Sequence, residues 1–208
     1  IKNAGDAQSL LNTAEGALEE VHTILLRMRE LAVQSSNDTV RDQDRDMLQT
    51  EVAQLEAEIQ RISDDTTWSG MTLLAGGFTT GATFQIGPRD TDTIQISLSG
   101  IDATLATGLV LASHVSTQAA AQDYIVTIDN AISIISADRA KYGATINRLD
   151  HAMANMGNIV TNLSAAKGRI MDADYAGESA NLARTQVLQQ ASMAMLSQAN
   201  ASKPVSYT

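Results

Sequence analysis

The stretch of the sequence that comes nearest to a metal site is Asp42-Gln43-Asp44-Arg45-Asp46, which has carboxylates at three alternate positions. Such spacing begins the calcium-binding loop of an EF-hand, whose oxygen ligands suit Ca²⁺. That loop also needs glycine at its sixth position and glutamate at its twelfth. Here these positions hold Met47 and Ala53. We therefore interpret the acidic run as the first turn of a helix, where carboxylates interact favourably with the helix dipole.

Other residue types that support catalysis or ligand binding form no recognisable pattern. The histidines His22, His114 and His151 have no ligand spacing among themselves, and no H-E-x-x-H string occurs. Gly76-Gly77 lacks the Lys-Ser/Thr of a phosphate loop, so we interpret it as a turn. The sequence has no cysteine and no G-x-S-x-G string. We therefore expect no enzyme activity, no cofactor and no metal.

The composition favours long helices packed side by side. Hydrophobic residues make up 44% of the 208 residues, but aromatic residues only 3%, so Ala, Leu, Ile, Val and Met supply the apolar surface. A net charge of −10 disfavours a nucleic-acid partner or an anionic membrane surface. The sequence contains no run of 18 apolar residues, so we expect no membrane insertion. The sequence opens at Ile1 with neither an initiator Met nor a signal peptide, so we expect a fragment of a longer protein.

The segment from Ala121 to Ile170 has apolar residues at alternating steps of three and four, the a/d repeat of a coiled coil. No proline interrupts it. A helix with one apolar face must find partner helices, and we expect most of the chain to supply them. The predicted seam positions are Ile125, Ile128, Ile132, Ile135, Arg139, Tyr142, Ile146, Leu149, Met153, Met156, Val160, Leu163, Lys167 and Ile170.

Two further helices are predicted ahead of this segment. Residues 1–34 have two adjacent apolar rows, which predict a helix with more than one neighbour. Thr39 with Asp42 predicts a capping pair for a second helix over about 40–62. The short connection favours an antiparallel arrangement. The main row of the first helix is Leu11, Ala14, Leu18, Val21, Leu25, Met28 and Ala32, beside Leu10, Ala17, Ile24 and Leu31, and that of the second is Leu48, Val52, Leu55, Ile59 and Ile62.

The remaining segments predict one small β element and a last helix. Residues 83–86 and 93–98 alternate with period two around a Gly-Pro loop, which predicts a β-hairpin. Residues 64–70 contain only turn signals, and 99–117 form a connector. Asp172 and Asp174 are interpreted as turn and cap residues. A final helix over 175–200 follows.

Several longer strings closely resemble bacterial flagellins. They are Arg27–Asn37, Arg169–Ala176 with Glu178, and Gln189–Asn200, together with the hairpin segment Phe84–Ile96. The resemblance covers nearly the whole chain. It implies a mainly α fold: an elongated bundle of long antiparallel, coiled-coil-like helices with a small β-hairpin element.

The resemblance also implies a domain organisation. Residues 1–174 correspond to the rod, or outer core, domain, with a β element at about 65–100 and a connector at 101–117. Residues 175–208 correspond to the C-terminal helix of the inner core, whose amino-terminal partner strand is missing. The Leu-rich carboxyl end is also absent, and the variable outer domains are reduced to the connector. We therefore expect the trimmed chain to stay soluble without polymerising, with residues 175–208 mobile or docked on a neighbouring molecule.

The function implied by the resemblance is structural. Subunits self-assemble by helix packing into the extracellular flagellar filament used for motility, after export without a cleaved signal peptide. Other flagellin subunits are the main partners, and an export chaperone and filament cap or junction proteins are also implied. The terminal helix supplies the assembly residues Leu182, Val187, Leu188, Met193, Met195 and Leu196.

Arg27, Leu31 and Glu51 match flagellin positions that lie near subunit contacts and are engaged by the innate-immune flagellin receptor. The alternative is a helix surface with a simple charge pair. A rival function is a cell-surface, flagellin-like protein that binds an extracellular ligand such as a polysaccharide. Carbohydrate sites usually need exposed aromatic residues, and Trp68, Phe78 and Phe84 all fall in the β element.

Overall fold

The computed structural model describes residues 1–75, 81–98, 115–172 and 174–201, which form four long helices and two short antiparallel hairpins. The predicted mainly α fold with a small β element is confirmed. The elements are α1 (Lys2–Ser35), α2 (Asp42–Asp65), β1 (Thr67–Trp68), β2 (Met71–Thr72), β3 (Ala82–Gln85), β4 (Thr93–Ile96), α4 (Gln118–Met171) and α5 (Tyr175–Ala201).

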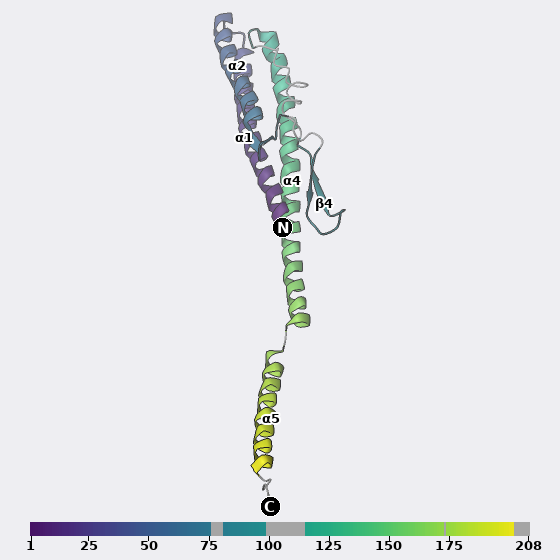
Figure 1. Ribbon diagram of the computed structural model, residues 1–208. Helices are drawn as coiled ribbons and strands as arrows, with labels where there is room; N and C mark the ends of the chain where they lie inside the picture. The colour runs from purple at the N-terminus through teal and green to yellow at the C-terminus, as the bar shows by residue number, and fades with distance from the viewer. Residues whose placement is uncertain (76–80, 99–114, 173, 202–208) are drawn as a thin grey trace, which may run out of the picture. The chain divides into compact units, whose positions relative to one another are not determined.

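The chain divides into two units, Ile1–Gly157 and Asn158–Thr208, and the division falls inside α4. The predicted domain boundary at residue 174 instead separates α4 from α5, and it stays a prediction. In the first unit α1, α2 and α4 lie side by side (Figure 1) and share one hydrophobic core. Helix α1 is antiparallel to α4, because Gln8 bonds to Asp150 whereas Arg29 bonds to Asp129.

Helix α1 forms the centre of this core. All seven residues of its predicted main row are buried, and so are Leu10 and Leu31 of the second row. Both rows belong to a core that includes residues of α2 and α4, so α1 has more than one neighbour, as the double pattern predicts. On α2, Val52 and Ile59 are buried, and Leu48 is partly buried against the same core.

Helix α4 buries a stripe that differs from the predicted seam. Ile128, Ile135 and Leu149 are buried as expected, but the second buried row lies one residue earlier than predicted. Predicted seam residues beside this row, Ile125 and Ile132 among them, are still partly buried against the core, so the stripe is broader than an a/d seam, as packing against two helices favours. Beyond Gly157 the predicted continuous seam is wrong for this chain, since Val160, Leu163, Lys167 and Ile170 are exposed. The buried residues are Ala121, Tyr124, Ile128, Ala131, Ile135, Asp138, Tyr142 and Leu149.

The predicted capping pair at the start of α2 is wrong. The N-cap is Arg41, and it makes no side-chain cap hydrogen bond. Thr39 is held in the preceding turn, because its backbone N–H donates to the Asn37 side chain at 3.2 Å. The acidic run nevertheless begins the helix, with Asp42 and Asp44 in the first turn as predicted.

The predicted hairpin is confirmed as β3–β4, in which Phe84 lies opposite Ile94. A second hairpin, β1–β2, lies inside the predicted β element at about 65–100 but was not itself predicted, and in it Trp68 lies opposite Met71. Its two loop residues, Ser69 and Gly70, have φ angles of 52° and 82°, as a two-residue type I′ turn requires.

Helix α5 begins at its predicted cap. Asp174 Oδ1 accepts hydrogen bonds from the backbone N–H groups of Ala176 and Gly177, at 3.1 and 3.2 Å. No α5 residue is buried. None of the described helices is long and apolar enough to cross a membrane. The predicted Gly76-Gly77 turn and most of the 101–117 connector lie outside the described residues.

Candidate functional site

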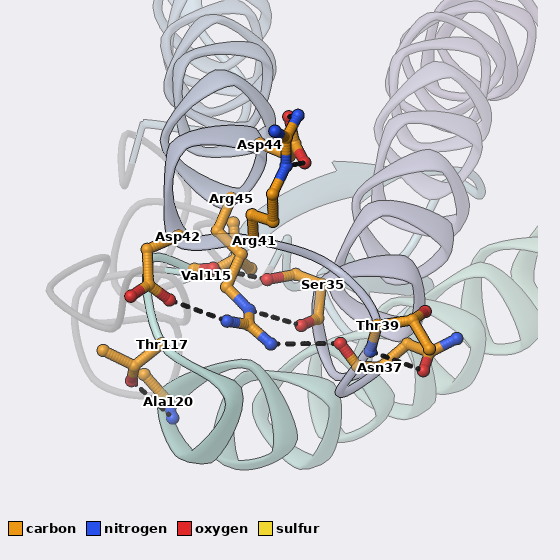
Figure 2. A network of polar contacts seen from close by, with 10 residues as sticks. All are labelled: Ser35, Asn37, Thr39, Arg41, Asp42, Asp44, Arg45, Val115, Thr117 and Ala120. Carbon is orange, nitrogen blue, oxygen red and sulfur yellow. Dashed lines mark hydrogen bonds and ion pairs between the residues drawn. The ribbon is translucent and has the colours of Figure 1, made fainter.

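The turn between α1 and α2 is held by one buried guanidinium (Figure 2). Arg45 Nε donates to the carbonyl oxygen of Ser35 at 2.9 Å, and its Nη2 donates to that of Asn37 at 3.0 Å. The third contact is an ion pair of 2.8 Å with Asp42. The Arg45 side chain is only 8% exposed, whereas Asp42 is 89% exposed. Arg45 therefore supplies a donor to the Ser35 carbonyl oxygen, which α1 itself cannot satisfy, and a second donor to Asn37, which also accepts from the N–H of Val40.

The same turn fixes the chain where it returns to α4. Val115 is buried, and both of its backbone polar groups are bonded to the first two helices. The Ser35 hydroxyl donates to its carbonyl oxygen at 2.5 Å, and the Gln49 side-chain oxygen accepts from its N–H at 2.6 Å. Thr117 then accepts a hydrogen bond from the N–H of Ala120 in the first turn of α4. We call residues 35–45 together with Val115 the α1–α2 corner.

Two acidic residues of this corner, Asp42 and Asp44, have arginine partners. Asp42 pairs with Arg45, and Asp44 pairs with Arg41 at 3.0 Å. The hydrogen bond from Arg41 holds the pKa of Asp44 below its usual value. Within the residues that the structure describes, no group of three or more His, Asp or Glu side chains could hold a metal ion. The geometry supports the interpretation of this run as a helix start.

The three candidate contact residues on α1 and α2 do not share one environment. Arg27 and Glu51 form an ion pair of 2.8 Å between the two helices, and Arg27 also pairs with Glu30 at 3.0 Å. Glu51 and Glu30 raise the pKa of Arg27, chiefly by accepting its hydrogen bonds. Leu31 is 1% exposed and belongs to the core. The structure therefore brings Arg27 and Glu51 together on the surface and places Leu31 beneath it.

Cross-helix ion pairs join α1 to α4 along the first unit. Arg29 pairs with Asp129 at 2.6 Å, and Arg139 pairs with Glu15 at 2.7 Å. Arg139 occupies a predicted seam position, and at the edge of the core its stem can pack while its charged end reaches Glu15. These pairs were not predicted, because the sequence does not show which charged residues face each other across two helices.

A buried tyrosine joins α4 to α2. Tyr124 is 0% exposed, and its hydroxyl donates to Glu56 Oε1 at 2.8 Å. Burial, and then the nearby Glu56 carboxylate, raise the pKa of Tyr124 far above its ordinary value. Sequence reasoning missed this residue because it lies outside the predicted seam. The spacing of Tyr124 from Ile128 was the available signal, since four residues separate neighbours on one helix face.

The remaining candidates of the sequence do not assemble into a site. His22 is half-buried on α1 and His151 is exposed on α4, while His114 lies outside the described residues. Trp68 and Phe84 are partly buried against the core, which leaves them poorly placed as an exposed platform for a polysaccharide. Phe78 lies outside the described residues.

Helix α5 presents large apolar side chains on three sides, among polar residues. At 100° per residue, Leu182, Met193 and Leu196 lie on one side of the helix. Leu188 and Met195 lie on a second side, and Val187 lies on a third. Exposed apolar side chains gathered in this way are typical of an interaction surface. The six predicted assembly residues, Leu182, Val187, Leu188, Met193, Met195 and Leu196, are 60–72% exposed.

The chain matches two protein-family models. Residues 1–79 match the bacterial flagellin N-terminal helical region, and residues 125–206 match the bacterial flagellin C-terminal helical region. Both matches include long helices of the described structure.

Similar proteins support these matches. The flagellin of Halalkalibacterium halodurans is 43% identical over 199 residues, which cover 96% of this chain and 73% of that protein. The flagellin of Bacillus subtilis is 36% identical over 96% of this chain and 76% of its own length. The crystal structure of Bacillus cereus flagellin superposes with a TM-score of 0.67 at 34% identity and covers 79% of this chain and 94% of that one.

Proposed function

This chain belongs to the bacterial flagellin family and is a structural subunit of the extracellular flagellar filament, and from that premise we propose that α5 is its main assembly helix. Flagellin is a structural protein and not an enzyme. The observation that carries the proposal is that α5 has large apolar side chains on several sides and no buried residue. In a filament, neighbouring subunits would cover these sides.

The physical drive is the burial of apolar surface. Each Å² of apolar surface removed from water contributes roughly 25 cal/mol. Six large apolar side chains are exposed along α5, and a contact that does not close on itself builds an open helical array. The apolar side chains of α5 are spread around the helix and not concentrated on one side, which favours several neighbours over a single partner. Assembly therefore depends on the filament surrounding α5.

Arg27 and Glu51 are a second proposed contact. Their ion pair lies on the surface of α1 and α2, so it could meet a neighbouring subunit or the innate-immune flagellin receptor. Leu31 would support this surface from below, because it is buried. Export without a cleaved signal peptide, an export chaperone and filament cap or junction proteins complete the proposal. They are supported by family membership and not by any contact in this chain.

The assembly role of α5 can be tested by adding full-length subunits to filament seeds. Leu188→Gln places a polar side chain on one side of α5 and keeps good helix propensity. Val126→Gln makes the same type of change at a 61% exposed position of α4. We expect Leu188→Gln to raise the subunit concentration needed for growth by about tenfold, since burying an unbonded amide costs about 1–3 kcal/mol. The control should change it little. Equal growth of wild type and Leu188→Gln would refute the role of α5.

A further inference from the structure

We propose that Met193 and Met195 are sites of oxidation by peroxides, and that their sulfoxides prevent a subunit from packing into the filament. The proposal rests on the assembly role of α5 and adds a chemical control to it. A subunit would be sensitive to oxidation until neighbouring subunits cover α5.

Exposure separates these two methionines from those of the core, whereas Met47 and Met171 are as exposed as they are. Met193 and Met195 are 68% and 72% exposed. Met28 is 0% exposed in the core of the first unit, and Met153 and Met156 are partly buried against it. Oxidation of a thioether requires access to its sulfur. Met193 and Met195 are therefore open to a dissolved oxidant, whereas Met28 is shielded.

The chemistry needs only a dissolved oxygen-atom donor. The sulfur lone pair of a methionine attacks one oxygen of hydrogen peroxide, an S–O bond forms and the O–O bond breaks. The sulfur is oxidised by two electrons, and the second peroxide oxygen leaves as water with both hydrogens. The product is a methionine sulfoxide, which enzymes of the methionine sulfoxide reductase type can reduce again.

The position of the two residues makes the change effective. Met193 lies on the side of α5 that carries Leu182 and Leu196, and Met195 lies on the side that carries Leu188. A sulfoxide converts a flexible apolar side chain into a polar one, and burying a polar group without a partner is unfavourable. Oxidation of both residues would thus disturb two separate packing surfaces of the same helix.

The first test measures oxidation directly. Full-length subunits are treated with hydrogen peroxide, and the sulfoxide content of each methionine is followed by peptide mass spectrometry. We expect Met193 and Met195 to oxidise at least about tenfold faster than Met28 in dissociated subunits. In assembled filaments the rates of Met193 and Met195 should fall toward that of Met28. Oxidation of Met193 and Met195 at the rate of Met28 in the dissociated subunit would overturn the proposal.

The second test measures the consequence. The double variant Met193→Leu/Met195→Leu keeps apolar side chains on α5, and Met47→Leu/Met71→Leu is the matched control at two exposed positions of the first unit. After peroxide treatment, wild type and control should need about tenfold more subunit to grow filaments. The Met193→Leu/Met195→Leu variant should grow after peroxide as it does untreated, and reductase treatment should restore the wild type to its own untreated growth.

The outcomes separate the two proposals. If Met193→Leu/Met195→Leu loses growth after peroxide as the wild type does, the oxidation proposal is overturned and the role of α5 stands. If untreated Leu188→Gln grows normally, the role of α5 fails, whatever the peroxide results.

Discussion

Replacing Arg45 with alanine should destabilise the first unit by about 1.5 kcal/mol. The guanidinium donates to the carbonyl oxygens of Ser35 and Asn37, but exposed Asn37 still accepts from the N–H of Val40 in the variant. The main cost is therefore at buried Ser35, since a buried acceptor that loses its partner costs about 1–3 kcal/mol. The ion pair with Asp42 adds little, because that carboxylate is 89% exposed.

The assay is thermal or urea unfolding followed by circular dichroism. For a unit of this size, a loss of about 1.5 kcal/mol lowers the melting temperature by roughly 3–6 °C. Arg41→Ala is the matched control, since Arg41 makes the same type of pair with Asp44 but is 77% exposed. We expect that variant to change stability by less than about 1 kcal/mol.

An intermediate variant sharpens the test. Arg45→Lys keeps a positive charge but replaces the planar fork with a single ammonium group, which cannot reproduce the arrangement of donors. Its stability should lie between those of wild type and Arg45→Ala. If Arg45→Ala and Arg41→Ala lower stability equally, the buried hydrogen bonds contribute nothing beyond surface charge, and our account of the α1–α2 corner is refuted.

Two further predictions concern the buried tyrosine and the missed hairpin. The pKa of Tyr124 in the folded chain is raised above its unfolded value of 10.0, so the unfolded chain loses this proton first as the pH rises. The free energy of unfolding should therefore fall above pH 10, by up to about 1.4 kcal/mol per pH unit. Urea unfolding of Tyr124→Phe should lack this part of the decline, and an equal dependence of stability on pH in wild type and variant would contradict the raised pKa of Tyr124. Ser69→Asn should stabilise the β1–β2 turn by about 0.5 kcal/mol, because Asn tolerates positive φ better than Ser does. Gly70→Ala should destabilise the same turn by about 1 kcal/mol. If both variants shift the melting temperature in the same direction, the turn does not limit stability.

The fold was largely predictable where one helix meets its neighbours through regular apolar rows. On α1, the rows that contain Leu18 and Leu31 are both buried as the pattern predicts. On α4, the sequence placed one row a residue too late, because a strict a/d period does not show how far the buried stripe widens toward two neighbouring helices. Tyr124 was missed for that reason.

Polar contacts were less predictable than apolar ones. Arg45 lies in an acidic run that suggested a cation site, and nothing in the sequence shows that its guanidinium turns back to the end of α1. The β1–β2 hairpin has strands of only two residues, too short for an alternating pattern to emerge. In both cases the decisive partner is set by tertiary structure, which local spacing does not contain.

The apolar pattern also shows which side chains must be covered without showing which molecule covers them. Before Gly157, the predicted seam of α4 packs within the chain, whereas Leu163 and Ile170 are 64% and 83% exposed. Exposed apolar surface of this extent is typical of an interaction site in a soluble protein. In a filament subunit the same period-3.5 pattern can therefore serve two purposes, to fold one chain and to join it to the next. Exposure in the single chain distinguishes these purposes, and it supports the proposal that Leu163, Ile170 and the apolar residues of α5 serve assembly.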